Sequence, residues 1–376
     1  MTKTGRAAVF LEDKRTFEVR DLPVPDPEPG AVLVRMTMAN VCGSDLHQWR
    51  GEMRSLIPVS PAGYVMGHEG AGRVAALGKG ITTDSLGRPL REGDRVVFAY
   101  FFPCGRCYAC LDDHPNACPN RLARFGPRGA DIHPYFTGTY ADYYYLRPGH
   151  YVFRVPDVLS DDVVSPVNCA LAQVTEGLRA SGFRYGDTVV LQGAGGLGLN
   201  AAAVARDMGA SRIVVIDRVP VRLALAREFG ADDVVDASEI TKPEDRVARV
   251  RELTDGVGAH VVMDLVGSPA VIPEGLEMLR QGGTYVEIGG IWPTTASFDP
   301  SRLVFGNRRI VAMSHYHPRV LPVALDFLAR HHTRYPFDKL LSHHFPLEQV
   351  NDAFAQAEWS RGESDPTKVV RAALVL

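Results

Sequence analysis

The stretch TVVLQGAGGLG, residues 188–198, decides the fold of the central part of the chain. Its first four residues are apolar or β-branched and predict a short buried strand. Gly193, Gly195 and Gly198 follow the pattern G-x-G-x-x-G, and the alanine-rich segment from Leu197 to Met208 predicts a helix. Glycines in this pattern allow a tight turn and bring backbone N–H groups and the helix N-terminus close to a pyrophosphate. The stretch therefore predicts a strand, loop and helix that bind a dinucleotide.

Beyond this stretch, apolar segments with the lengths of strands alternate with helical segments. This alternation implies right-handed crossovers and a parallel sheet that is covered on both faces. We therefore expect an α/β fold with a Rossmann doubly wound domain over residues 170–312. The predicted strands are 188–191, 212–216, 233–235, 260–264 and 284–288, and the predicted helices are 197–208, 221–229, 246–253 and 270–279.

Asp217, at the end of the second predicted strand, indicates which dinucleotide the loop takes. A carboxylate about 20 residues beyond the glycines accepts hydrogen bonds from the ribose hydroxyls and repels a 2′-phosphate. Asp217 therefore favours NAD over NADP, although the following Arg218 and Arg222 soften this preference. A glycine-rich turn with a surface aspartate is the alternative, and the strand and helix around the loop disfavour it. The residues expected here to bind the cofactor are Gly193, Gly195, Gly196, Leu197, Gly198, Asp217, Arg218 and Arg222.

The first part of the chain has a different texture, rich in glycine, proline and short β-like runs. The runs 32–37, 70–76 and 95–99 are separated by turn signals and predict a mostly β domain with twisted or barrel-like sheets. The tail predicts one helix, 320–330, and one strand, 368–370, and is too short to fold alone. We therefore expect residues 1–169 and 313–376 to form one domain. The hydrophilic stretch 81–92 predicts a loop, to which we assign no function.

Composition excludes several classes of protein. The chain has 376 residues, a formal net charge of -3 and 45% hydrophobic residues, which are ordinary values for a soluble globular protein without a basic surface for nucleic acid. The apolar run Ala7–Leu11 is shorter than the core of a signal peptide, and no run approaches the roughly 18 apolar residues of a membrane span. We expect a cytoplasmic protein that binds neither nucleic acid nor membrane, whose cysteines bind metal rather than form disulfides.

Four of the six cysteines lie close together in the pattern C-x2-C-x2-C-x7-C. Closely spaced thiolates on a folded loop provide the four soft ligands of a tetrahedral zinc site, and four protein ligands leave no position open for chemistry. An iron–sulfur cluster and a zinc ribbon for nucleic acid are the alternatives. The former favours a shorter final gap, and the latter favours a basic surface. The predicted structural zinc ligands are Cys104, Cys107, Cys110 and Cys118.

Cys42, His68 and Cys169 remain, far apart in the chain. Two thiolates and an imidazole match one ligand set of catalytic zinc, which keeps a fourth position open. The alternative is three isolated buried residues, since free cysteines are often buried. Spacing alone does not decide between these interpretations.

These motifs together resemble the zinc-containing alcohol dehydrogenases of the medium-chain dehydrogenase/reductase family, over essentially the whole chain. The resemblance rests on CGSD at 42–45, GHE at 67–69, the four cysteines, the glycine loop and GTYVEIG at 283–289. It implies a GroES-like, mostly β catalytic domain that carries two zinc sites, beside the Rossmann domain, with Gly289 in the cofactor site. It also implies that the chain acts as a homodimer or homotetramer.

The resemblance also implies roles for the residues around the second zinc. Cys42, His68 and Cys169 would be its ligands, and Asp45 would orient the ligand histidine. Glu69 would be an acid able to approach the metal, and it is our reserve as third ligand, because some branches of the family use glutamate where this chain has Cys169.

The implied reaction moves a hydride between an alcohol, or its aldehyde or ketone, and NAD. Ser44 resembles the hydroxyl that relays the proton, and His47 resembles the outer base that passes it on. Without the neighbouring Cys42, a capping hydroxyl and an exposed imidazole would be the simpler interpretations of these two residues.

Other possibilities stay open. A polyol or amino-alcohol dehydrogenase of the same family, and a non-catalytic protein that binds zinc and NAD, are the alternatives. Tyr100 is our candidate for the substrate pocket by family position, whereas Trp49, Phe101, Phe102 and the run 143–145 are expected mostly to pack in cores. The residues 315–317 would contact substrate or a partner subunit, or lie on the surface.

Overall fold

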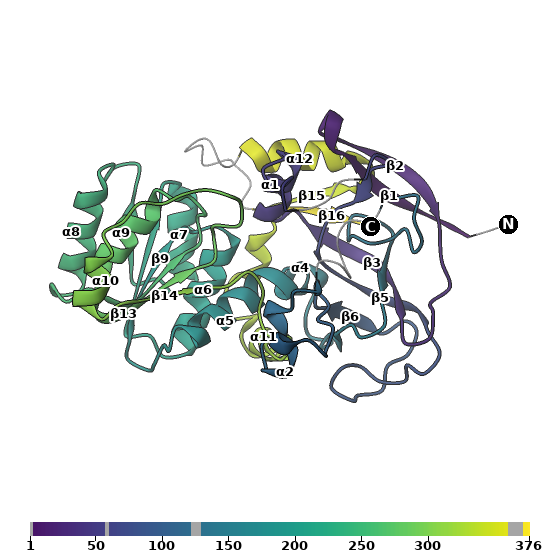
Figure 1. Cartoon of the computed structure of the whole chain (residues 1–376), viewed down its shortest axis with the longest axis horizontal. Helices are drawn as coiled ribbons and strands as arrows, with labels where there is room; N and C mark the ends of the chain where they lie inside the picture. The colour runs from purple at the N-terminus through teal and green to yellow at the C-terminus, as the bar shows by residue number, and fades with distance from the viewer. Residues whose placement is uncertain (1–2, 57–59, 122–128, 360–370) are drawn as a thin grey trace.

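The computed structural model describes residues 3–56, 60–121, 129–359 and 371–376. The chain forms two lobes side by side along its long axis (Figure 1). One lobe is built from the middle of the chain, and the other is rich in strands and contains both ends of the chain (Figure 1). Within the described ranges, no helix is long and apolar enough to cross a membrane.

The first lobe contains a six-stranded parallel sheet in the order β11-β10-β9-β12-β13-β14. This order confirms the predicted doubly wound sheet. Successive strands are added outward in one direction from β9 to β11 and in the other direction from β12 to β14, so the strand order reverses between β9 and β12. Five strands overlap the five predicted ones. The sixth, β14, was not predicted, because it is a short and mostly exposed edge strand. The strands are β9 (Thr188–Gln192), β10 (Arg212–Asp217), β11 (Asp233–Asp236), β12 (Ala259–Asp264), β13 (Leu279–Glu287) and β14 (Arg309–Ala312).

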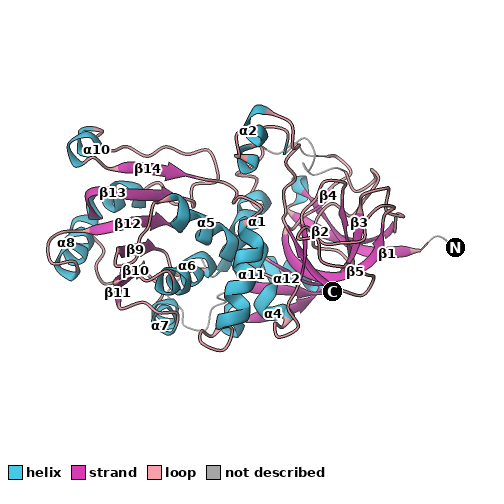
Figure 2. Ribbon diagram, turned by 90° about the horizontal axis from the view of Figure 1, so that it is seen from below, coloured by secondary structure: helices cyan, strands magenta, loops and turns pink. Residues whose placement is uncertain are grey.

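Helices cover both faces of this sheet, as Figure 2 shows. Side chains alternate across a strand, and Val189 and Leu191 of β9 pack on one face whereas Val190 packs on the other. The first face contacts α5, α6 and α7, and the second contacts α8 and α9. The helices are α5 (Ala172–Ala180), α6 (Gly196–Asp207), α7 (Pro220–Glu228), α8 (Pro243–Leu253), α9 (Val271–Met278) and α10 (Ser301–Gly306).

The second lobe contains a sheet in the order β15-β16-β3-β5-β6-β8, with β7 paired beside β3, and a smaller sheet β2-β1-β4. The tail strands β15 and β16 join β3, so the end of the chain completes a sheet that its first part begins. The predicted tail strand 368–370 lies outside the described residues. The strands are β1 (Thr4–Leu11), β2 (Thr16–Pro23), β3 (Val32–Asn40), β4 (Tyr64–Val65), β5 (Glu69–Leu77), β6 (Arg95–Phe98), β7 (Tyr143–Leu146), β8 (Val152–Arg154), β15 (His343–Pro346) and β16 (Ala372–Val375).

The remaining helices lie in or beside the second lobe and at the junction of the two lobes. A single hydrophobic cluster runs from Val97 and Phe153 of the β lobe to Leu199 and Met263 of the Rossmann lobe, so the lobes share a continuous core. The helices are α1 (Gly43–Trp49), α2 (Tyr108–Leu111), α4 (Asp161–Val164), α11 (Val320–His331) and α12 (Val350–Trp359), with short helical turns at Glu12–Lys14, Pro115–Ala117, Phe337–Leu340 and Leu347–Gln349.

A single π-helical turn, Val167–Leu171, leads into α5 at this junction. Such turns widen a helix locally and are often found at functional sites. The turn carries Cys169, and all five of its residues are buried.

The hydrophilic stretch 81–92 is a loop, as predicted. Its geometry comes from the buried Asp84, whose carboxylate accepts hydrogen bonds from the backbone N–H groups of Leu86, Arg88 and Arg154. The loop is therefore tied to β8 rather than free to close over another part of the molecule.

Candidate active site and the two metal clusters

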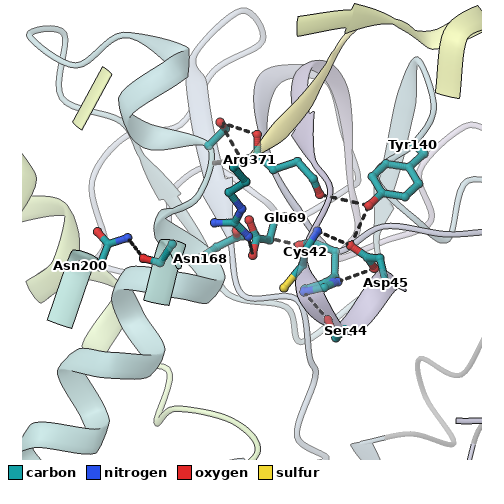
Figure 3. Close-up of polar contacts among 12 residues, drawn as sticks. Cys42, Ser44, Asp45, Glu69, Tyr140, Asn168, Asn200 and Arg371 are labelled. Atoms are coloured by element: carbon teal, nitrogen blue, oxygen red, sulfur yellow. Dashed lines mark hydrogen bonds and ion pairs between the residues drawn. The ribbon is translucent and has the colours of Figure 1, made fainter. Parts of the chain in front are cut away.

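The structure brings Cys42, His68, Glu69 and Cys169 into one cluster, in which the potential ligand atoms all lie within 4.8 Å of one another. These residues come from three features of the fold. Cys42 precedes α1, His68 immediately precedes β5, which Glu69 opens, and Cys169 lies in the π-helical turn. The tertiary structure thus assembles three predicted ligands and the reserve ligand at the junction of the lobes, where Figure 3 shows the polar contacts.

The buried carboxylate of Asp45 joins two of these residues. One oxygen accepts a hydrogen bond from the backbone N–H of Cys42 at 2.9 Å, and the other lies 3.1 Å from Nδ1 of His68. An acceptor at Nδ1 places the proton there, which leaves Nε2 of His68 as the ligand atom. The geometry fits the orienting role predicted for Asp45.

Cys42 and Cys169 interact directly. The hydrogen bond between the two thiols lowers the pKa of Cys42 well below its usual range, against the effect of burial, and the neighbouring His68 lowers it further. The same bond and burial raise the pKa of Cys169. A thiophilic metal bound between the two sulfurs would displace their protons.

Glu69 and Arg371 form a buried ion pair beside this cluster. Burial raises the pKa of Glu69 to about 8, although the positive charge of Arg371 lowers it. Oε2 of Glu69 has no hydrogen-bond partner among the described residues. Two thiols, an imidazole and this unpartnered carboxylate oxygen match the donors of a zinc site, so the residues present fit the metal.

Arg371 connects the cluster to the glycine loop, and sequence reasoning missed it. A Cβ atom placed on Gly196 would lie 3.3 Å from Nη1 of Arg371, so the guanidinium lies between Glu69 and the first turn of α6. The available signal was a lone arginine immediately before the apolar run AALVL, residues 372–376.

Ser44 and His47 lie on α1, next to the cluster. Oγ of Ser44 is 3.5 Å from Nε2 of His68. His47 is 4% exposed, which excludes the surface imidazole considered as an alternative. Its Nδ1 pairs with Glu52, and its ring stacks on Trp292 with centroids 3.9 Å apart. Glu52 and Trp292 were not predicted, and Trp292 reaches His47 from the Rossmann lobe.

The four-cysteine lobe is the second cluster. Its sulfurs also lie within 4.8 Å of one another, and all six cysteines of the chain are free thiols. The backbone N–H of Arg106 and the amide of Asn120 lower the pKa of Cys104 to about 6. The arrangement fits the structural zinc site predicted for Cys104, Cys107, Cys110 and Cys118.

Polar contacts fasten this lobe to the segment that follows β14. The amide of Asn116 donates to the carbonyl of His315 at 3.1 Å, and Asp113 pairs with His317 and Arg319. His317 is therefore engaged by the lobe rather than free for substrate.

The glycine loop has the geometry that its pattern predicted. A Cβ atom on Gly198 would lie 1.9 Å from the carbonyl oxygen of Gly193, so only glycine fits this close approach. Asp217 ends β10 and accepts hydrogen bonds from the backbone N–H groups of Ala194 and Val219. Its carboxylate thus holds the loop and remains at the carboxyl edge of the sheet. Arg218 is exposed, Arg222 lies on α7, Gly196 and Leu197 open α6, and Gly289 follows β13.

Aromatic side chains line one side of the metal cluster. The ring of Tyr100 meets His68 edge-on with centroids 4.9 Å apart, and His315 lies 5.4 Å from Tyr100. Burial lowers the pKa of His315 to about 3, so this imidazole is neutral.

The other aromatic residues considered for the pocket belong to cores. Tyr316 is buried and donates its hydroxyl to the carbonyl of Asn168, beside Cys169. Trp49 packs on Phe354 in the β lobe. The residues that are buried in hydrophobic clusters are Phe101, Phe102, Tyr143, Tyr144 and Tyr145.

Comparisons with known proteins agree with this geometry. Residues 28–157 match the alcohol dehydrogenase GroES-like domain family, and residues 196–330 match the zinc-binding dehydrogenase family. A 5-exo-hydroxycamphor dehydrogenase of Pseudomonas putida is 35% identical, over 93% of this chain and 94% of that protein. A sorbitol dehydrogenase of Bacillus subtilis is 28% identical, over 93% of both. The solved structure of an alcohol dehydrogenase from Thermotoga maritima has a TM-score of 0.89 and 30% identity, with 99% of both chains covered.

Proposed function

The chain belongs to the zinc-containing alcohol dehydrogenases of the medium-chain dehydrogenase/reductase family, and on this premise we propose that it oxidises alcohols with NAD at the Cys42, His68 and Cys169 centre. The observation that carries the proposal is the assembly of that buried cluster beside the glycine loop, with Arg371 between them. The reverse reaction, reduction of an aldehyde or ketone, uses the same groups.

A zinc ion held by Cys42, His68 and Cys169 would supply a Lewis acid that lowers the pKa of an alcohol, and NAD would accept the hydride. The residues of the chain do the remaining work. Asp45 keeps the ligand nitrogen of His68 turned toward the cluster. Ser44, beside that nitrogen, relays the proton that the alcohol loses by accepting it while giving up its own, and the buried His47 accepts the relayed proton and passes it toward solvent. Glu52 and the stacked Trp292 hold the imidazole of His47 in place.

NAD rather than NADP is the proposed cofactor, because a carboxylate at the position of Asp217 in this motif would accept hydrogen bonds from the ribose hydroxyls and repel a 2′-phosphate. Both oxygens of Asp217 already accept hydrogen bonds from backbone N–H groups, which keeps this carboxylate fixed in orientation. The catalytic efficiency measured with each cofactor tests this assignment. Equal efficiency with the two cofactors would mean that Arg218 and Arg222 offset Asp217.

The substrate is proposed to be a small alcohol with an apolar body. Tyr100 and the neutral His315 form an aromatic wall next to His68, which favours an apolar part of the substrate on this side of the site. The similarity to a hydroxycamphor dehydrogenase supports a cyclic secondary alcohol, and the similarity to a sorbitol dehydrogenase supports a polyol as the second candidate. A panel of both kinds of alcohol separates these candidates.

We also infer that the chain forms a homodimer or homotetramer. The edge strand β14 and the preceding helix α10 expose Val304 at 72%, Phe305 at 83% and Ile310 at 40%. Exposed apolar side chains beside an open sheet edge favour contact with another chain. Light scattering of the wild type and of Phe305→Glu measures this state. The cytoplasmic location expected from the sequence stays a prediction, which cell fractionation tests.

The first experiment is zinc content per chain, combined with NADH formation on the alcohol panel. Two zinc ions and NADH formation support the proposal. One zinc ion that survives Cys42→Ser, without reduction of NAD or NADP, would leave a non-catalytic zinc protein and overturn it.

A further inference from the structure

Tyr140 is a buried residue of the β lobe that the sequence motifs do not single out. It is 0% exposed, and its ring packs against Phe17 and Phe354. A tyrosine ring packs favourably in such a hydrophobic core, but its hydroxyl needs a hydrogen-bond partner there. The position of that hydroxyl is therefore informative.

The hydroxyl of Tyr140 points to Asp45, the carboxylate that joins two of the metal ligands (Figure 3). It lies 2.7 Å from Oδ2 of Asp45 and 3.1 Å from the carbonyl oxygen of Asn40. The same Oδ2 accepts the backbone N–H of Cys42, while Oδ1 faces His68. One chain of hydrogen bonds thus leads from the tyrosine, through a single carboxylate, to two ligands on separate segments.

The backbone and ring of Tyr140 support the same ligand from a second direction. Its N–H donates to the carbonyl of Met66 at 3.0 Å, and the N–H of Thr139 donates to the carbonyl of Gly67 at 3.1 Å. A Cβ atom on Gly67 would lie 2.7 Å from Cδ1 and Cε1 of the ring, so the backbone before His68 lies directly against the ring of Tyr140. The ring and the hydroxyl therefore make separable contributions.

We propose that Tyr140 is a positioning residue for the metal centre, whose hydroxyl holds Asp45 so that His68 and Cys42 are placed before the metal binds. The proposal rests on the proposed function, in which these residues hold zinc. Without the hydroxyl, Oδ2 of Asp45 would keep its hydrogen bond from the N–H of Cys42 but lose its hydrogen bond to Tyr140, which anchors it to the hydrophobic core. The carboxylate would then rotate more freely, and a partner that orients a ligand histidine would be less fixed.

The test compares zinc release from the wild type, Tyr140→Phe and Tyr285→Phe. Tyr140→Phe keeps the ring and removes only the hydroxyl. Tyr285 is the matched control, because it is also buried and its hydroxyl donates to Gln192 at 3.0 Å within the Rossmann lobe. Each protein, loaded with two zinc ions, is mixed with excess chelator, and released zinc is followed with time. The zinc of the four-cysteine lobe is an internal reference in the same molecule.

We expect Tyr140→Phe to release one zinc ion faster by a few-fold, below the roughly 10- to 100-fold effect of removing a direct partner of a ligand histidine. The second zinc ion, and both zinc ions of Tyr285→Phe, should leave at wild-type rates. Release of both ions faster from Tyr140→Phe, or of neither, would overturn the proposal. If the wild type held only one zinc ion per chain, and Cys42→Ser held the same amount, that zinc would belong to the four-cysteine lobe. This result would overturn the proposed function, and this inference with it.

Discussion

The two metal clusters of this protein are built in opposite ways. The potential ligands of the four-cysteine lobe all come from residues 104–118, and three of its four cysteines are partly exposed. The proposed ligands of the other cluster come from positions 42, 68 and 169, and this cluster lies at the junction of the lobes with Arg371 from the tail beside it. A closed site can be specified by spacing along one loop. A site that must keep a position open needs walls and charges from distant parts of the chain.

The clusters also differ in the charges around them. Backbone N–H groups and Asn120 lower the pKa of Cys104 in the lobe. The central cluster lies among the buried charged groups Asp45, Glu69 and Arg371, which are expensive to bury unless paired. We therefore expect loss of metal from the central cluster to lower turnover, and loss of metal from the four-cysteine lobe to lower thermal stability.

The largest expected effect comes from Cys42→Ser. We expect turnover to fall by roughly 1,000-fold or more, because the metal stabilises the transition state by several kcal/mol and each 1.4 kcal/mol is a factor of ten. Zinc content should fall by one ion per chain, with little change in the unfolding temperature. Steady-state kinetics, metal analysis and thermal unfolding measure the three quantities.

Cys110→Ser is the matched change in the lobe and should reverse the pattern. It should also remove one zinc ion. It should lower the unfolding temperature by several degrees and turnover by less than Cys42→Ser, since the lobe cysteines are separate from the central cluster and the lobe is fastened to the segment 315–319. If the two variants lost turnover and thermal stability in the same proportions, the division of roles between the clusters would be wrong.

Arg371→Met tests the buried charges of the assembled site. Above pH 8, where Glu69 is ionised, we expect a loss of about 3–5 kcal/mol in the free energy of unfolding, because the carboxylate of Glu69 would be left buried without its cation. Urea denaturation measures this loss, and the double variant with Glu69→Gln should recover much of it. A loss below about 1 kcal/mol would contradict the importance of the pair.

His47→Gln tests the proton path away from the centre. Turnover should fall by on the order of tenfold at low pH and by less at high pH, where hydroxide in solution accepts the proton more readily. The profile of turnover against pH checks this difference. An equal loss at every pH would exclude a relay role for His47.

The smallest expected effect concerns the buried Asp264 and the half-buried Glu287, two carboxyl groups that neighbouring strands bring together. Burial, and then the charge of Asp264, raise the pKa of Glu287 from 4.5 to about 7. The folded state therefore binds the proton more tightly than the unfolded state, so stability should fall as pH rises from about 4.5 to 7.

Glu287→Gln should remove that slope. The difference in free energy of unfolding between this variant and the wild type should therefore be more favourable to the variant at pH 8 than at pH 4, by on the order of 1–2 kcal/mol. Urea unfolding at a series of pH values measures the slope, and the exposed Glu244→Gln is the control. An unchanged slope in Glu287→Gln would show that other groups set the pH dependence.

The predictions that the structure confirms are local ones. Five strands of the Rossmann sheet could be predicted because each depends on residues near one another in the chain. The glycine loop and the lobe cysteines were identified from equally local patterns, and their roles in binding NAD and zinc stay predictions. The edge strand β14 lacked such a pattern. Glu52 and Trp292, which contact His47, had no signal in the sequence, because their importance comes only from the side chain they meet.

The sequence by itself determined the doubly wound sheet, the family and the residue types available for two metal sites, since periodicity, glycine patterns and cysteine spacing act over short distances. Only the tertiary structure decided which residues meet. It placed Arg371 of the tail on Glu69, Tyr140 on Asp45 and Trp292 on His47. The physical reason is that a buried charge or hydroxyl is stable only beside a partner, and packing of the whole chain chooses that partner.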